Sequence, residues 1–521
     1  MKKGLKIGII VGTILIGGIA FVIYKLYSHR SDVHLKLIPK NAAAVVKIDI
    51  KELAMKADVL KLLQQPGFKN SGNASLNELI SDPFATGIDP IENVYAFISK
   101  QADHQDAAIV FNVDDAAKLE TFENKLHIAA SETTVESGIY YSPISETECI
   151  AWNDDAGILL STSSGEAKTD AIAFLNQSKE NSILENPDYK TFADKTFDVG
   201  MFFNNRELSQ MSGTEKTLSS LGMSDGHGEI IVNFENDKIS AAYTNYASSS
   251  GLNNPILKKT GPDAKQFNAI STAPPLVYLG VAADMTELFT VIKNDPDLST
   301  DLAGIEMGFG INETTLRKLF TGDISLSFTD FKDISDYDPR IKEDVANKMK
   351  LDPKTDRSYY SLNTPMCYLS IGETDDVKMG DMLANSGMEK IENFYAMPGL
   401  GYIVYVAAKD GHLLITNDYF AAETLSEKGT FSSPLPKEIS TTDALSFYTD
   451  LDQKHFPASL TETCKSIFGD EQMDFYLTAI KPFQHIRVAG KENGSQLEIA
   501  IAPGDGNSLY RLLCYYGAMT K

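Results

Sequence analysis

The side chains with the clearest chemical pattern are acidic or hydroxylic and lie between positions 295 and 306. The pattern consists of Asp295, Asp297, Ser299 and Asp301 at alternate positions, with Glu306 at the twelfth place. Alternating oxygen ligands followed by a distal Glu are typical of a calcium-binding EF-hand loop. However, Thr300 occupies the sixth place, where such loops carry Gly, and Pro296 stiffens the second. We therefore interpret this segment as a solvated acidic connector.

Motifs of known catalytic machinery are absent from the sequence. It contains no G-x-S-x-G, H-E-x-x-H or phosphate-loop pattern, and Gly308-Phe309-Gly310 lacks the third glycine of a dinucleotide-binding turn. The eight histidines are dispersed, so we expect surface or capping roles for them. The pairs Asp114-Asp115 and Asp154-Asp155 fall at an expected helix start and an expected turn. We predict no catalytic, cofactor-binding or metal-binding residues.

Cysteine and tryptophan usage excludes further classes of site. The four cysteines, Cys149, Cys367, Cys464 and Cys514, show no C-x-x-C spacing, which argues against a zinc ribbon or a redox dithiol. We favour four unpaired thiols, with a disulfide such as Cys464–Cys514 as the alternative. The only tryptophan, Trp152, falls in an expected strand, which argues against an aromatic carbohydrate platform.

Charge and length define the broad class of the protein. The 521 residues carry a net charge of −24, and residues 1–30 hold five basic groups and no acidic ones, so the rest carries −29. So acidic a body repels phosphate backbones, and we expect no nucleic acid partner. With 43% hydrophobic residues the chain is globular, and its length indicates two or more domains.

The N-terminal region has the pattern of a membrane anchor. Ile7–Tyr24 is free of charge and follows Lys2, Lys3 and Lys6. Such a run is just long enough to span a bilayer, and the preceding lysines favour a cytoplasmic N-terminus. We predict a cytoplasmic N-terminus at 1–6, a transmembrane signal anchor at 7–24 and a stem at 25–37. A cleaved signal peptide is the alternative.

This topology implies a membrane protein with most of its chain outside the cytoplasm, on the periplasmic side. Gly4, Gly8 and Gly12 lie on one face of the anchor, and small residues at that spacing let two transmembrane helices approach closely. A homodimer through these glycines is therefore a minor alternative.

A sequence pattern that predicts a strand followed by a helix occurs four times in the rest of the chain. Each copy has an apolar β-type run followed by Asp or Asn and a helix start; the copies lie at 39–53, 196–208, 274–288 and 442–456, with Asp49, Asn204, Asp284 and Asp450 at the junctions. Such short polar side chains can accept bonds from the free N–H groups of a first helical turn.

The order of the other segments indicates an internal duplication. Five blocks recur in the same order: 94–99 with 323–329, 107–113 with 366–371, 148–162 with 401–416, 197–204 with 444–450, and 228–246 with 484–502. We predict an α+β fold of two similar halves, each an antiparallel sheet with covering helices. The halves run from 38 to 247 and from 276 to 521, joined by a connector at 248–275, and a charged insertion at 331–365 interrupts the second half.

Several short phrases resemble one bacterial family. They are Ile38–Ala42 before Val45–Asp49, Asp82-Pro83 with Gly87-Ile88-Asp89, and Asn507-Ser508-Leu509 with Leu512-Leu513. They resemble a family of Gram-negative envelope proteins known only as domain of unknown function 4836. The resemblance spans most of residues 35–520 and implies envelope placement, but it supplies no activity and no catalytic residues.

These observations favour a non-enzymatic role. We expect an envelope-anchored binding or assembly module whose partner is an unidentified protein or glycan. The alternative is a hydrolase acting on an envelope or dietary polymer, which a cleft with clustered carboxylates or a Ser–His pair would favour.

Overall fold

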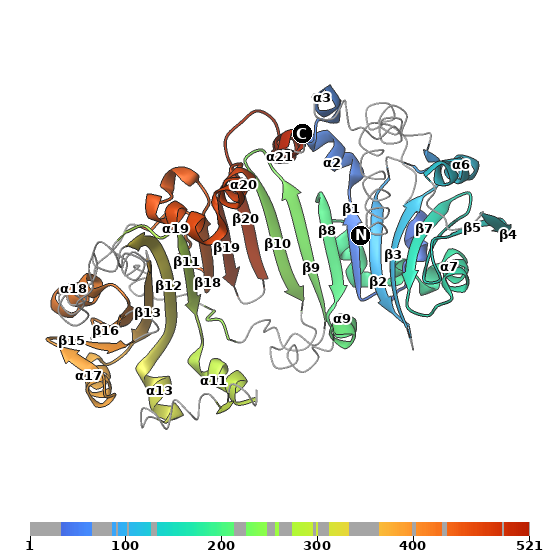
Figure 1. Ribbon diagram of the computed structural model, residues 1–521. Coiled ribbons are helices and arrows are strands. Elements are labelled where there is room, and N and C mark those ends of the chain that lie inside the picture. Colours follow the sequence, from blue (N-terminus) through green and yellow to red (C-terminus); the bar gives the residue numbers. More distant parts are fainter. Residues whose placement is uncertain are drawn as a thin grey trace. The chain divides into compact units, whose positions relative to one another are not determined.

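The computed structural model describes residues 33–519, except 65–85, 90–91, 102–103, 127–132, 213–225, 247–255, 260–272, 295–298, 301–311, 333–363, 399–402, 430–434 and 492–493. Two compact units are present. The first comprises Met1–Ser219, Met223–Gly251 and Pro503–Lys521, and the second comprises Ser220–Gly222 and Leu252–Ala502. Figure 1 labels their helices and strands.

The first unit is built on one antiparallel sheet (Figure 1). Its strands are β1 (Ala44–Ile48), β2 (Val94–Lys100), β3 (Gln105–Asn112), β4 (Thr134–Glu136), β5 (Ile139–Pro143), β6 (Glu148–Trp152), β7 (Ala156–Thr162), β8 (Val199–Asn204), β9 (His227–Phe234) and β10 (Lys238–Tyr246). They pair in the order β4-β5-β6-β7-β3-β2-β1-β8-β9-β10.

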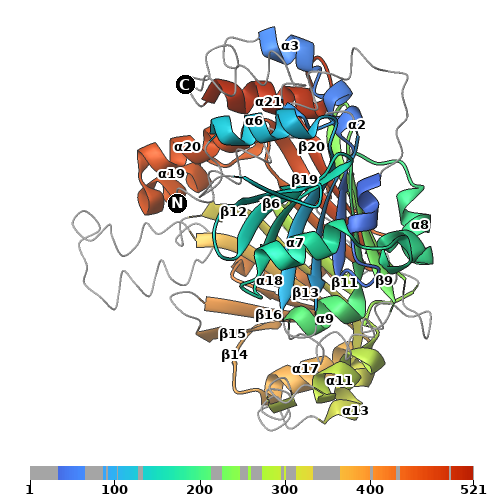
Figure 2. The same ribbon diagram turned by 90° about the vertical axis from the view of Figure 1, so that its right-hand side faces the viewer.

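Helices cover both faces of this sheet because successive strand residues point to opposite sides. The helices are η1 (Val33–Leu37), α2 (Ile50–Lys56), α3 (Val59–Gln64), α6 (Ala116–Leu126), α7 (Ala167–Leu175), η3 (Lys179–Asn181), η4 (Ile183–Glu185), α8 (Pro187–Ala193), α9 (Asn205–Ser212) and α21 (Ser508–Met519). Helix α7 packs on β6 and β7 (Figure 2). We call the side with Phe97, Ala108 and Leu160 the α7 face and the side with Ile109 and Leu159 the α6 face.

The strands of the second unit also pair antiparallel to one another. Its strands are β11 (Val277–Ala282), β12 (Phe320–Lys332), β13 (Thr364–Glu373), β14 (Glu389–Ile391), β15 (Phe394–Pro398), β16 (Ile403–Lys409), β17 (His412–Thr416), β18 (Leu445–Asp450), β19 (Phe483–Lys491) and β20 (Gly494–Ile501). Its helices are α11 (Met285–Asn294), α13 (Glu313–Leu319), α17 (Asp376–Asn385), α18 (Tyr419–Lys428), η5 (Gln453–His455), α19 (Ala458–Phe468) and α20 (Asp470–Ile480). The strand order is β14-β15-β16-β17-β13-β12-β11-β18-β19-β20.

The two units therefore share one strand order, as predicted, with β11–β20 taking the places of β1–β10. The registers also agree. Ala96 lies opposite Val46 on one side and Ile109 on the other, and in the second unit Leu326 lies between Leu279 and Leu369. Ala96 and Leu326 thus occupy equivalent positions, and the same pairings relate their paired neighbours on the central strands.

The polar residues at the strand–helix junctions mostly act as predicted. Asp49, Asn204 and Asp284 each accept hydrogen bonds from backbone N–H groups in the first turn of the following helix. Asp450 differs, because it accepts from Asp452 N–H and contacts His455, and a 3-10 turn follows it rather than an α-helix.

The C-terminal segment corrects the predicted second half, which was to run to residue 521. Residues 503–521 belong to the first unit. The Asn507 side chain and the Ser508 N–H donate to Phe234 and Glu235 carbonyls at the end of β9, and Leu509 and Leu513 pack against the α2–α3 region. Helix α21 therefore covers the α2–α3 helices.

The predicted stem at 25–37 also ends too late. Residues 33–37 form η1, and Leu35 and Leu37 are part of the first unit's buried core. The anchor at 7–24, the stretch 1–6 and Gly4, Gly8 and Gly12 lie outside the described residues. So do most of the 248–275 connector and residues 333–363 of the predicted insertion, whose flanks belong to β12 and β13. Among the described residues no helix is long and apolar enough to cross a membrane.

Candidate functional site

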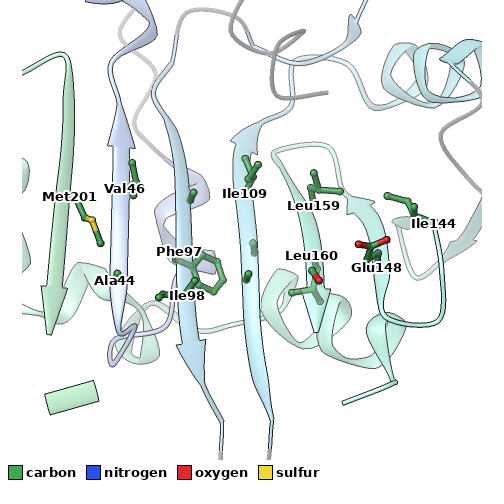
Figure 3. A pocket seen from close by; sticks show the side chains of 14 residues that line it. Ala44, Val46, Phe97, Ile98, Ile109, Ile144, Glu148, Leu159, Leu160 and Met201 are labelled. Carbon is green, nitrogen blue, oxygen red and sulfur yellow. The ribbon is translucent and has the colours of Figure 1, made fainter. Parts of the chain in front are cut away.

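An apolar cavity of about 330 Å³ lies on the α6 face of the first sheet (Figure 3). Six neighbouring strands, β8, β1, β2, β3, β7 and β6, contribute to its wall, the last through Glu148, and Ile144 adds to it. Side chains that line it include Ala44, Val46, Ala96, Ile109, Leu159 and Met201. This volume falls at the lower end of the range of small-molecule pockets, about 300–1,000 Å³.

The cavity exists because helix α6 covers only one end of these strands. There, Trp152 is fully buried, stacks on Tyr140 and donates its indole N–H to the Ala116 carbonyl of α6. The Phe111 ring lies over Gly157, where an added Cβ would approach the ring within 2.3 Å. Beyond this packed end, small residues at Ala96 and Ala107 leave space on the same face.

The second unit has a smaller cavity at the equivalent place. Its volume is about 210 Å³, and its lining includes Leu326, Leu369 and Ile415. Strand pairing makes Leu326 the counterpart of Ala96 and Cys367 the counterpart of Ala107. Larger side chains at both positions account for the smaller space, so the first unit is the half with room for a ligand.

Among the described residues that line the first cavity, Glu148 is the only ionisable one. Its carboxylate accepts a hydrogen bond from the Ser145 hydroxyl at 3.3 Å. A single carboxylate beside an apolar wall disfavours anionic ligands and tolerates neutral or cationic groups. It does not form the carboxylate pair that glycoside hydrolysis needs.

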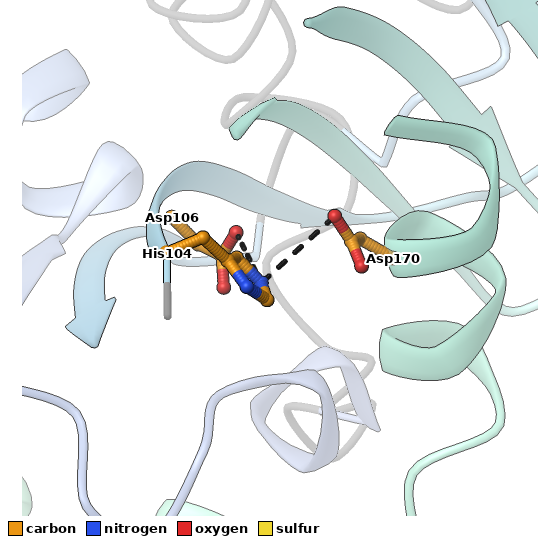
Figure 4. A group of neighbouring side chains, drawn as sticks. All are labelled: His104, Asp106 and Asp170. Carbon is orange, nitrogen blue, oxygen red and sulfur yellow. Dashed lines mark ion pairs between the residues drawn. The ribbon is translucent and has the colours of Figure 1, made fainter. Parts of the chain in front are cut away.

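A separate polar cluster lies on the opposite face of β3 and β7 (Figure 4). His104 lies between two carboxylates: its Nε2 is 3.6 Å from Asp106 Oδ1 and 4.0 Å from Asp170 Oδ2. His104 precedes β3, Asp106 lies in it, and Asp170 lies in the first turn of α7. Among the described residues these three form a group with metal-ligand geometry, because their ligand atoms lie within 4.8 Å of one another.

Hydrogen bonds in the β7–α7 loop position Asp170. The hydroxyls of Thr162 and Ser164 donate to its Oδ2 at 3.0 and 2.5 Å. Asp106 is only 2% exposed, and neither of its carboxylate oxygens has a hydrogen-bond partner among the described residues. Burial raises the pKa of Asp106, and the nearby Thr162 and His104 side chains offset part of that rise.

The residues that the sequence singled out are structural where they are described. Asp115 caps helix α6, and Asp154 and Asp155 lie at the β6–β7 turn, beside Asn153, whose side chain caps that turn. Trp152 is buried and presents no face to solvent. The four cysteines are free, and burial raises the pKa of the Cys149 thiol to about 12. The calcium-like pattern lies outside the described residues apart from Ser299, as does Gly308–Gly310.

The expectation that every histidine has a surface or capping role is wrong for two of them. His34 is fully buried and contacts Asn112 Oδ1 at 2.7 Å. His412 is 1% exposed and contacts the Ser370 hydroxyl. The His104 cluster was also missed, although one signal existed. His104-x-Asp106 places two ligand types two residues apart at the start of a strand, but Asp170 is too distant in sequence to be linked to them.

Comparisons with known proteins place the chain in a family but not in a function. No curated protein matches it. Two solved structures, of crystal forms I and III of TP0453, are each 12% identical to this chain in sequence and align with a TM-score of 0.27. Each alignment covers 43% of this chain; it covers 82% of the TP0453 chain in form I and 83% in form III. A TM-score of this size carries no conclusion about this chain. The family match, in contrast, extends over residues 34–337, more than half of the sequence, so the chain belongs to the family described as Domain of unknown function (DUF4836).

Proposed function

We propose that this protein is a non-catalytic binding module, anchored in the cell envelope, whose first unit binds a single aliphatic chain. The observation that carries the proposal is the apolar cavity of about 330 Å³ on the α6 face. The predicted anchor at 7–24 and the family resemblance support envelope placement, where aliphatic ligands are abundant.

The chemistry of the cavity favours an uncharged amphiphile. Each methylene group that moves from water to an apolar site contributes about 0.8 kcal/mol. For a chain of moderate length, part of this gain offsets lost ligand freedom, so we expect a micromolar dissociation constant. Glu148 and the net charge of the chain, −24, both disfavour an anionic head group. A neutral monoacylglycerol therefore suits the site better than a fatty acid anion.

The alternative of a polymer hydrolase lacks support at this site. The described residues that line the cavity supply one carboxylate, that of Glu148, and one hydroxyl, that of Ser161, and they include no histidine or cysteine. Neither an acid–base pair nor an activated nucleophile can be assembled from those groups.

The single tryptophan provides the test. Trp152 belongs to the same buried cluster as Leu159, and Ile109 and Ile144 pack against that cluster. Leu159, Ile109 and Ile144 also line the cavity, so they connect Trp152 to it. We expect the fluorescence emission of Trp152 to change saturably when 1-decanoylglycerol is titrated into a chain that starts at residue 31. The lipid is kept below its critical micelle concentration. Decanoate should bind more weakly. An unchanged emission, together with no bound lipid after equilibrium dialysis, would refute the proposal.

A further inference from the structure

The side-chain cluster at His104 contains the donors that a transition-metal ion uses. One imidazole and two carboxylates suit zinc and related divalent ions. Ligand atoms at about 2.0–2.2 Å from a tetrahedral zinc ion lie about 3.3–3.6 Å from one another. The two separations from His104 Nε2, 3.6 and 4.0 Å, need only a small contraction to reach that geometry.

Asp106 supplies an independent reason to expect a cation. A buried carboxylate without hydrogen-bond donors is strongly unfavourable unless a positive charge compensates it. Asp106 is 2% exposed, both of its oxygens lack a hydrogen-bond partner among the described residues, and it faces His104 (Figure 4). The basic side chain paired with it among the described residues is that of His104, at 3.6 Å.

The repeat shows that the fold itself does not require these residues. Pairing makes Cys367 the counterpart of Ala107, and counting back along the chain from these two residues matches Met366 with Asp106 and Thr364 with His104. Met366 is fully buried in an apolar cluster against helix α18. The same place in the same fold is thus stable with an apolar side chain where the first unit has Asp106.

The surroundings of Asp170 have the form of a metal-ligand support. Residues that hold a ligand in orientation through hydrogen bonds are a regular feature of metal sites. The Thr162 and Ser164 hydroxyls both donate to Asp170 Oδ2, and the Ser164 side chain in turn accepts the Glu166 N–H. The carboxylate is thereby held toward His104.

We propose that His104, Asp106 and Asp170 bind one divalent transition-metal ion of the zinc class. The three protein ligands leave a fourth position for water. The ion would join the start of β3 to the first turn of α7. Strands β3 and β7 contribute Ala107 and Ser161 to the apolar cavity, and the ion would lie on the opposite face of these strands. This proposal does not depend on the identity of the cavity's ligand.

The experiment uses untagged full-length protein in a non-ionic detergent, dialysed against a chelator and then against zinc. We expect one zinc ion per chain, and a melting temperature that rises by about 5 °C at a hundredfold excess over the dissociation constant. His104→Gln and Asp170→Asn should each weaken zinc binding by at least about tenfold. His455→Gln is the matched control, because His455 pairs with one carboxylate, Asp450, in a group outside the cluster.

Two further readouts separate a metal site from a purely structural cluster. Without metal, Asp106→Asn should be no less stable than the wild type, whereas zinc should stabilise only the wild type. On the wild type, zinc should protect His104 from diethyl pyrocarbonate and leave the exposed His455 reactive. If zinc fails to protect His104, or binds His104→Gln and Asp170→Asn as tightly as the wild type, the proposal is wrong.

Discussion

Replacing Ala96 by Leu should weaken the binding of 1-decanoylglycerol by at least about tenfold, equivalent to about 1.4 kcal/mol. Ala96 lines the first cavity, and its counterpart Leu326 lines the smaller cavity of the second unit. The substitution thus places in the first unit a side chain that the second unit already accommodates at that register. Three added carbons then occupy volume that the ligand would fill. The measurement is the Trp152 fluorescence titration.

The matched control is the reverse change in the other unit. Leu326→Ala enlarges the second cavity and leaves the first untouched, so Trp152 should report the same affinity as in the wild type. Thermal unfolding of both variants checks that the fold is retained. If Ala96→Leu binds the ligand as the wild type does, the cavity is not the binding site.

Replacing Glu373 by Gln should remove a large pH dependence of stability. Glu373 is 3% exposed, and its neighbours include Asp376. Burial, followed by the hydrogen bond with Asp376, raises the pKa of Glu373 from its ordinary value of 4.5 to about 8. One pKa unit corresponds to about 1.4 kcal/mol, so ionisation of Glu373 should destabilise the fold by on the order of 5 kcal/mol.

The direction follows from the raised pKa. The contribution of Glu373 to stability is fully present below the unfolded pKa of 4.5 and is lost as the pH rises through about 8. In Glu373→Gln the amide stays neutral, so the variant should be clearly more stable than the wild type at pH 9 and similar to it at pH 4.5. Denaturant unfolding at both pH values measures this difference. The exposed Glu471→Gln substitution changes net charge equally and should leave the pH dependence intact; an equal effect of both variants would contradict the account.

The strand order could be predicted from the sequence because apolar periodicity and turn residues are local signals. The hairpins β6–β7, β9–β10, β16–β17 and β19–β20 were all predicted, with ends within a few residues of those observed. The order of the matched blocks then implied two equivalent sheets, which the strand pairings confirm.

The elements that were missed are those whose stability depends on distant contacts. Hairpins β4–β5 and β14–β15 are short and polar at one end, and helix α8 starts at Pro187 after several 3-10 turns. Helix α21 carries an amphipathic pattern, but nothing local specifies that Leu509 and Leu513 pack near Ala54, more than 450 residues earlier.

The family match ends at residue 337, whereas the resemblance was expected to reach 520.

The candidate sites could not be derived from the sequence because both arise from cross-strand register. Ala44, Ala96 and Ala107 are ordinary strand residues until pairing places them side by side on one face. Likewise, His104 and Asp106 acquire their third partner only when β7 leads into helix α7 beside them. The spacing of these residues along the chain does not predict either arrangement.

Photoaffinity mapping tests the central claim most directly. A 1-decanoylglycerol analogue with a diazirine on its aliphatic chain would be irradiated with the protein, and the labelled residues identified by mass spectrometry. The account predicts labels on β1, β2, β3 and β7, at Val46, Ala96, Ile109 and Leu159, with loss of these labels in Ala96→Leu. Labels confined to the exposed apolar side chains of helices α19 and α20, such as Ile467 and Phe475, would contradict it.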